Sequence, residues 1–167
     1  INSCNDAIYN FKLMNANSRI APEQFNIRYS DAIAIRSWAY LQVALHFADV
    51  EKGGVPYITQ PLNEIDQLSE ENLSKFPYLD LTSMIDSLLY AMESIPFKGL
   101  TNDEGLITTI DGFSTKFMFI DKEYFLGELN LWKGNYYQAA VYFKSIMERA
   151  SGSGNPYDMY KIPFDAS

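Results

Sequence analysis

The sequence predicts an all-α fold of antiparallel helical hairpins. Three observations support this: apolar residues recur at helical spacing in several segments, Gly and Pro separate those segments, and no stretch of six or more residues alternates cleanly between polar and apolar side chains. A sheet is therefore not expected. Helices are predicted over residues 2–15, 22–49, 78–95, 113–132 and 135–150, as one domain spanning residues 1–167.

The second predicted helix is apolar nearly all round its second half, from Ala32 to Phe47. Such a helix is expected to lie between two neighbours. A long connection then separates the second helix from the third, and long connections are either functional or held down by their own side chains. We expect an ordered loop, packed through its apolar residues Val55, Tyr57, Ile58, Leu62 and Leu68.

The third predicted helix shows the clearest amphipathic pattern. Its apolar residues follow one another at spacings of 4, 3, 4 and 3, which places them on one helical face: Leu81, Ile85, Leu88, Met92 and Ile95. Polar residues, including Asp86 and Ser87, take the other face. Pro77 suits a first helical turn, and Pro96 ends the run.

The last two predicted helices match the spacing of a tetratricopeptide hairpin. Six residues agree with that pattern: Leu126, Gly127, Gly134, Tyr136, Ala139 and Phe143. Small residues let two antiparallel helices approach, large residues fill the space beside them, and glycine turns the chain. Glu123, Asn130 and Ser151 depart from the pattern. The alternative is an ordinary helical hairpin. The chain has room for about two repeats, whereas a stable repeat array generally needs three.

The net charge of −8, from 21 acidic and 13 basic residues, argues against two classes of partner. Nucleic acids and anionic lipid surfaces attract basic proteins, so neither is expected to bind by charge. The longest stretch without a charged residue, Ser37–Ala48, is shorter than the about 20 residues of a membrane span. The first residues, from Ile1, show neither the basic region nor the apolar run of a signal peptide, and we expect the sequence to be a processed chain or a piece of a longer protein.

Several segments, in order along the chain, resemble the SusD/RagB family of outer-membrane nutrient-uptake lipoproteins of Bacteroidetes. Two segments depart from the family pattern, at Ala48 in place of Gly and at Phe113 in place of Arg. The resembling segments are Ile1–Asn5 with Ala7-Ile8, Arg36–Leu41, Phe47–Val50 with Gly54–Tyr57, Gly112–Lys116, and Gly134–Ala139.

The resemblance implies a location and partners. It suggests the helical scaffold of a longer lipoprotein on the cell surface, held to the outer membrane only by a lipid anchor upstream of this chain. Members of the family cap a SusC-like TonB-dependent transporter and bind glycans, or in some cases peptides, before import. Their glycan-contacting aromatic residues lie mostly outside these helices, so the resemblance transfers no binding residue. It implies no cofactor.

No catalytic or metal-binding set emerges from the residues. The single histidine, His46, has no neighbouring His or Cys with ligand spacing, and the single cysteine, Cys4, suits a helix face. Nothing pairs two carboxylates at the separation that glycosidases use. Aromatic side chains outside the predicted helix cores are the remaining candidates for stacking on sugar rings: Tyr57, Trp132, Tyr136, Tyr157 and Tyr160.

Two functions remain in competition. The first is a non-enzymatic nutrient-binding component, with a glycan the expected ligand. The alternative is a tetratricopeptide adaptor that binds a protein segment in its groove. Grooves of that kind are often lined by basic residues, and the few lysines of these helices, Lys116, Lys122, Lys133 and Lys144, are scattered. An enzyme would need polar side chains that converge on one site, and the sequence shows no such cluster.

Overall fold

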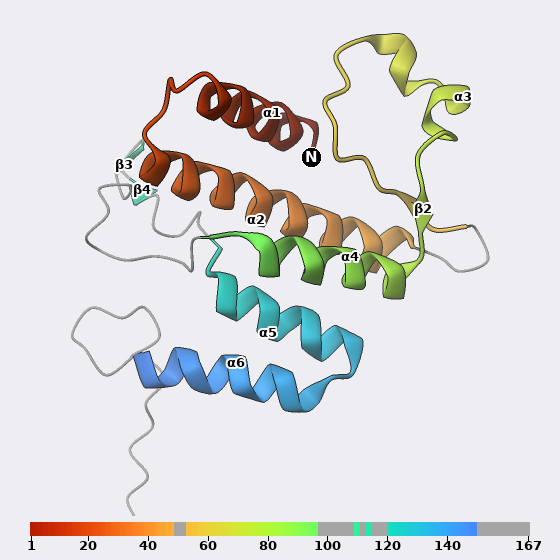
Figure 1. Cartoon of the computed structure of the whole chain (residues 1–167). Coiled ribbons are helices and arrows are strands. Elements are labelled where there is room, and N and C mark those ends of the chain that lie inside the picture. The colour runs from red at the N-terminus through yellow and green to blue at the C-terminus, as the bar shows by residue number, and fades with distance from the viewer. Residues whose placement is uncertain (49–52, 97–108, 111–112, 115–119, 150–167) are drawn as a thin grey trace, which may run out of the picture.

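The computed structural model describes residues 1–48, 53–96, 109–110, 113–114 and 120–149 (Figure 1). This part of the chain is mostly helical, which confirms the predicted helical character. Its longer helices are α1 (Asn2–Ala16), α2 (Pro22–Phe47), α4 (Leu81–Ser94), α5 (Lys122–Lys133) and α6 (Tyr136–Arg149), and α3 (Glu70–Leu73) is a single turn.

The five longer helices form a row in which each packs against the next. Figure 1 shows successive helices running in opposite directions, from α1 through α2, α4 and α5 to α6. Helix α4 lies in the middle of the row. Its buried side chains, together with buried residues of α2 and α5, make the centre of the core: Leu41, Met84, Ile85, Leu88, Met92, Phe125 and Leu129.

Helix α2 lies between α1 and α4, as its apolar composition predicts, yet it is not buried all round. Ile35 and Trp38 are exposed. This exposure arises because the helices form a single row, which leaves part of α2 without a neighbouring helix.

Short strands correct the expectation that no sheet forms. In the first pair, β1 (Val55–Pro56) lies antiparallel to β2 (Tyr78–Leu79) and closes the base of the long connection. In the second, β3 (Thr109–Ile110) pairs with β4 (Phe113–Ser114). Each strand has only two residues, which is too short to produce an alternating sequence pattern. The connection also contains a 3₁₀ turn over Ile65–Leu68 and α3, where only loop was predicted.

Two predicted helix starts lie too early, and side-chain caps explain both. Helix α4 begins at Leu81 instead of residue 78, because the Asp80 carboxylate accepts a hydrogen bond from Ser83 N at 2.7 Å. Pro77 therefore precedes the first turn. Helix α5 begins at Lys122 instead of residue 113, because Asp121 accepts hydrogen bonds from the backbone N–H groups of Glu123 and Tyr124.

The α5–α6 hairpin is built around two glycines. Gly134 ends α5 with a φ of +80°, a backbone conformation that glycine adopts without steric cost. Gly127 faces the ring of Phe143, and a Cβ at this glycine would lie 2.8 Å from two carbons of that ring. Leu126 and Ala139 are buried beside them. Close approach of the two helices thus depends on the missing side chain at Gly127.

Substitution of Gly127 tests this packing. We expect Gly127→Ala to lower the free energy of unfolding by about 1 kcal/mol, because an overpacking cost of about 1–3 kcal/mol exceeds a gain in helix propensity of about 0.5–1 kcal/mol. In a Phe143→Ala background the same change should stabilise the protein. Urea unfolding of the four proteins measures both effects, and an equal effect of Gly127→Ala in the two backgrounds would contradict the proposed contact.

Candidate ligand-binding pocket

An extended segment of the long connection, residues 57–62, crosses α1 and α2, and we call it the strap. Polar side chains of the two helices bind its backbone as a neighbouring strand would. Asn2 Nδ2 donates to Leu62 O and Asn2 Oδ1 accepts from Leu62 N, both at 2.9 Å. The Tyr40 hydroxyl bonds both the N–H and the carbonyl of Ile58 at 2.8 Å. The strap is therefore ordered through hydrogen bonds as well as through apolar packing.

Asn5 is the buried centre of these contacts. Its Nδ2 donates to the carbonyls of Ile58 and Gln60, both at 3.0 Å. Its Oδ1 accepts a hydrogen bond from Arg36 Nη1 at 3.0 Å. The same nitrogen of Arg36 lies 3.4 Å from Thr59 O. One amide thus joins α1, α2 and the strap.

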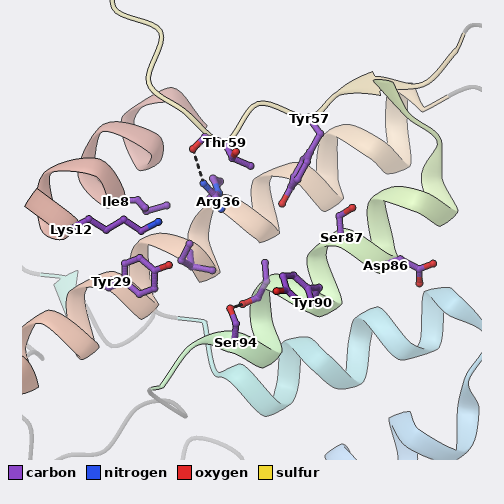
Figure 2. A pocket seen from close by; sticks show the side chains of 12 residues that line it. Ile8, Lys12, Tyr29, Arg36, Tyr57, Thr59, Asp86, Ser87, Tyr90 and Ser94 are labelled. Atoms are coloured by element: carbon purple, nitrogen blue, oxygen red, sulfur yellow. Dashed lines mark hydrogen bonds between the residues drawn. The ribbon is translucent and has the colours of Figure 1, made fainter. Parts of the chain in front are cut away.

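The strap closes one side of an open pocket of about 610 Å³ between α1, α2 and α4 (Figure 2). Three tyrosines from different elements line it: Tyr29 of α2, Tyr57 of the strap and Tyr90 of α4. Charged and hydroxyl groups complete the polar lining: Lys12, Arg36, Thr59, Asp86, Ser87 and Ser94. The pocket therefore combines aromatic surface with hydrogen-bonding groups.

The tyrosines are held to different degrees. The Tyr57 ring packs at 5.0 Å against Tyr40, and the Tyr29 ring stacks on Phe25 at 5.2 Å. Lys12 Nζ lies 5.6 Å from the centre of the Tyr29 ring, a cation–π distance. Tyr90 is 78 % exposed and projects from the polar face of α4. Two rings are thus positioned by packing, whereas the third is free to meet a ligand.

Burial keeps the two inner phenols neutral. It raises the pKa of both Tyr40 and Tyr57, and this effect exceeds the opposing effects of the Ile58 hydrogen bond on Tyr40 and of the Arg36 charge on both phenols. Both hydroxyl groups therefore remain protonated at neutral pH.

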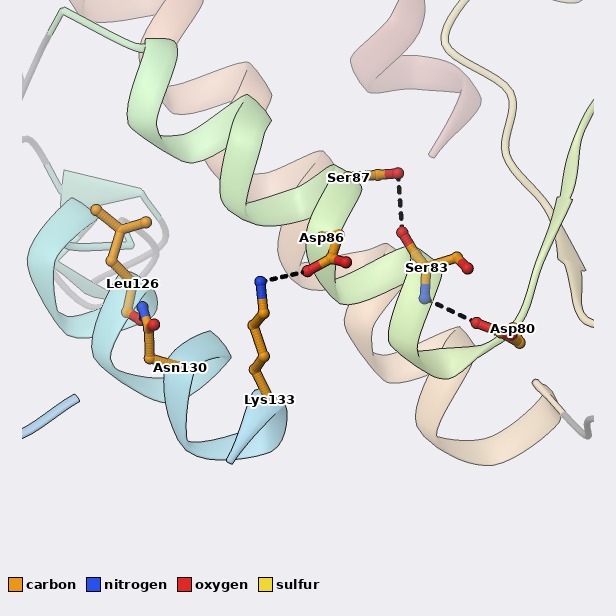
Figure 3. A network of polar contacts seen from close by, with 7 residues as sticks. All are labelled: Asp80, Ser83, Asp86, Ser87, Leu126, Asn130 and Lys133. Atoms are coloured by element: carbon orange, nitrogen blue, oxygen red, sulfur yellow. Dashed lines mark hydrogen bonds and ion pairs between the residues drawn. The ribbon is translucent and has the colours of Figure 1, made fainter. Parts of the chain in front are cut away.

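The carboxylate of the pocket, Asp86, is paired. Asp86 Oδ1 lies 2.7 Å from Lys133 Nζ of α5, and Figure 3 shows this ion pair beside the capping bond of Asp80. Asp86 and Tyr90 also line a second hollow of about 580 Å³, between α4, α5 and α6. The exposed face of α4 thus separates two hollows on the same row of helices.

Of the aromatic residues that the sequence offered, only Tyr57 lies in the larger pocket. Trp132 and Tyr136 are 52 % and 71 % exposed at the α5–α6 turn. The other two candidates, Tyr157 and Tyr160, lie outside the described residues.

Four pocket residues did not emerge from the sequence: Lys12, Tyr29, Arg36 and Tyr90. Two of them stand out in the sequence in a way that could have identified them. Tyr90 is an aromatic residue on the polar face of an amphipathic helix, and Arg36 is a charged residue within an apolar segment. The other candidate groups do not gather: His46 is exposed at the end of α2, and Cys4 is half-buried on α1. Among the described residues, no three His, Cys, Asp or Glu side chains lie together as metal ligands would.

Comparison with protein-family models, with curated proteins and with solved structures found no match for the chain. In the part of the chain that the structure describes, no helix combines the length and the apolar character needed to span a membrane.

Replacement of Asn5 tests how the strap is held. We expect Asn5→Ala to lower the free energy of unfolding by about 2–3 kcal/mol, because it leaves buried polar groups without a partner. Asn2→Ala is the matched control: Asn2 is exposed, so water replaces its two bonds and the loss should be about 0.5–1 kcal/mol. Urea unfolding measures both. Equal losses would show that burial of Asn5 is not what secures the strap.

A second prediction concerns Glu128, which lies on α5 one turn before Trp132. Burial raises the pKa of Glu128, and a hydrogen bond from the Trp132 side chain opposes this only in part. Its folded pKa thus exceeds the ordinary value of 4.5, so the associated stability is complete below that pH and is lost as pH rises through the folded pKa. Glu128→Gln should therefore raise Tm at pH 7 and have little effect near pH 4.

Thermal unfolding at both pH values, with Glu71→Gln as an exposed control, measures this effect. An equal change in Tm for Glu128→Gln at the two pH values would contradict the role of burial.

Proposed function

We propose that this chain is a non-enzymatic oligosaccharide-binding module and that the pocket between α1, α2 and α4 is its binding site. The observation that carries the proposal is the convergence of Tyr29, Tyr57 and Tyr90, from three separate elements, on one open pocket. Sugar rings present apolar C–H faces that stack on aromatic rings, while tyrosine adds a polar tip. The surrounding hydroxyl and charged groups can bond the sugar hydroxyls.

The carboxyl groups available in the pocket support binding without cleavage. Glycoside hydrolysis generally uses two carboxyl groups placed on either side of the scissile bond. Asp86 is the one carboxylate among the described lining residues, and it pairs with Lys133. We therefore assign the pocket a role in holding its ligand.

The proposed setting is that of the SusD/RagB family, which the sequence resembles. There the chain would form the helical scaffold of a surface lipoprotein of the outer membrane, docked on a SusC-like TonB-dependent transporter and delivering nutrient to it. The proposal is supported by the segments that resemble the family and that follow one another in the family's order along the sequence. Hydrogen bonds that join one of these segments to the residues just after another add to this support. Arg36 and Tyr40 belong to one segment, and both bond to the strap, which follows the Gly54-Val55-Pro56 of another.

We also propose that α5 and α6 form a hairpin of tetratricopeptide type. The support is local. Gly127 lies against Phe143, Leu126 and Ala139 are buried, and Gly134 turns the chain in the left-handed conformation. Each of these features suits the role that the repeat pattern gives the residue.

An adaptor function is the second candidate, and one observation favours it. Helix α6 exposes large apolar side chains at Tyr137, Val141 and Met147. Exposed apolar side chains that gather on one surface often mark a site where another protein binds. A tetratricopeptide adaptor would use such a surface, whereas the binding module would depend on the pocket.

Substitution of Tyr90 separates the two functions. We expect Tyr90→Ala to weaken oligosaccharide binding about tenfold, because loss of one aromatic contact removes about 1.5 kcal/mol. Tyr90 is exposed, so Tm should not change. Tyr137→Ala, on α6 and as exposed as Tyr90, is the control and should bind normally. Binding is measured by isothermal titration with the oligosaccharides that a glycan array selects.

Two outcomes would overturn the proposal. Failure of every oligosaccharide on the array to bind would leave the adaptor function in the lead. Loss of binding on Trp132→Ala or Tyr136→Ala, with Tyr90→Ala unaffected, would move the site to the α5–α6 turn.

A further inference from the structure

The pocket contains a buried cation that no carboxylate in the described part of the chain pairs with. Arg36 is only 6 % exposed and lines the pocket. Its hydrogen bonds to described residues all leave from Nη1, toward Asn5 Oδ1 and Thr59 O. Among the described residues, Nε and Nη2 of Arg36 have no hydrogen-bond partner, and both atoms keep some accessible surface. The edge of the guanidinium that Nε and Nη2 form is therefore available to a ligand.

A buried cation without a counter-charge is costly, which makes this arrangement informative. The chain carries 21 acidic residues, yet no described carboxylate forms an ion pair with Arg36. The guanidinium is planar and presents its N–H groups in a fixed fork, which matches the oxygens of a carboxylate or a sulfate. Arg36 thus offers a preformed position for an oxyanion.

A second cation lies in the same pocket. Lys12 extends from α1 over the ring of Tyr29, and Figure 2 shows it pointing into the pocket from the side where Arg36 lies. The one described carboxylate of the lining, Asp86, occupies the other end and is neutralised by Lys133. The pocket is therefore locally basic on a protein whose net charge is −8.

We infer that the pocket selects anionic oligosaccharides, with an acidic group on the sugar held by Arg36 and Lys12. The inference rests on the proposed oligosaccharide-binding function and names its substrate class. The acidic group is the carboxylate of a uronic acid or a sulfate ester, since both present oxygens that fit the guanidinium fork. The tyrosines then take the sugar rings.

Matched ligands test the inference directly. Isothermal titration compares oligogalacturonate and hyaluronan oligosaccharides with the methyl esters of their carboxylates, which keep the sugar and remove the charge. Chondroitin sulfate oligosaccharides and their desulfated forms give the sulfate comparison. We expect a charged form to bind at least about tenfold more tightly than its neutral partner, and to weaken as NaCl rises from about 20 to about 300 mM.

Protein variants then locate the effect. Lys12→Gln should weaken binding of the charged form about threefold to tenfold and leave the neutral form unchanged, because Lys12 is exposed and its charge acts over a short distance. Lys75→Gln, an exposed lysine outside the pocket, is the matched control and should change neither. Arg36→Lys keeps the charge and removes the fork, and should weaken the charged form more strongly than Lys12→Gln does. The Lys12 variant decides the matter if Arg36→Lys does not fold.

The outcomes separate this inference from the function on which it rests. Equal or tighter binding of the neutral forms would overturn the charge selection and leave oligosaccharide binding intact. An equal loss for Lys12→Gln and Lys75→Gln would show that net charge, and not this pocket, attracts the ligand. Absence of binding by every oligosaccharide, charged or neutral, would overturn the proposed function itself.

Discussion

The structure depends on a single buried amide. Asn5 bonds two carbonyls of the strap and the guanidinium of Arg36, so that α1, α2 and the long connection meet at one side chain. An extended segment that crosses helices has no neighbouring strand to satisfy its backbone, and polar side chains must do so instead. With the strap held in this way, Tyr57 and Thr59 become the wall of a pocket.

Helix α4 shows how one amphipathic element serves both the core and the surface. Its apolar face supplies Met84, Ile85, Leu88 and Met92 to the centre of the molecule. Its polar face carries Asp86 and Tyr90 between two hollows. Because the helices form a single row, a helix buried on one side stays open on the other. The same geometry that leaves Ile35 and Trp38 of α2 exposed thus gives α4 an exposed surface at the proposed binding site.

The helical part of the fold could be predicted from the sequence, because the 4-3-4-3 spacing from Leu81 to Ile95 reports directly on which face is buried. The starts of α4 and α5 could not, since Asp80 and Asp121 look like any acidic residue until their carboxylates meet backbone N–H groups. The residues of the proposed site were harder to predict than the helices. Only Tyr57 was a candidate from the sequence. Lys12, Arg36 and Tyr90 come together through contacts between helices, which no local sequence pattern encodes.

The proposed site and the fold share Arg36, and this sharing has a consequence. One nitrogen of the guanidinium helps to hold the strap, and the same residue lines the pocket. A ligand that binds the folded pocket and not the unfolded chain stabilises the fold in proportion to its affinity. An anion on Arg36 would also supply the counter-charge that the described residues do not provide. Recognition of an acidic sugar and anchoring of the strap would then reinforce each other through one side chain.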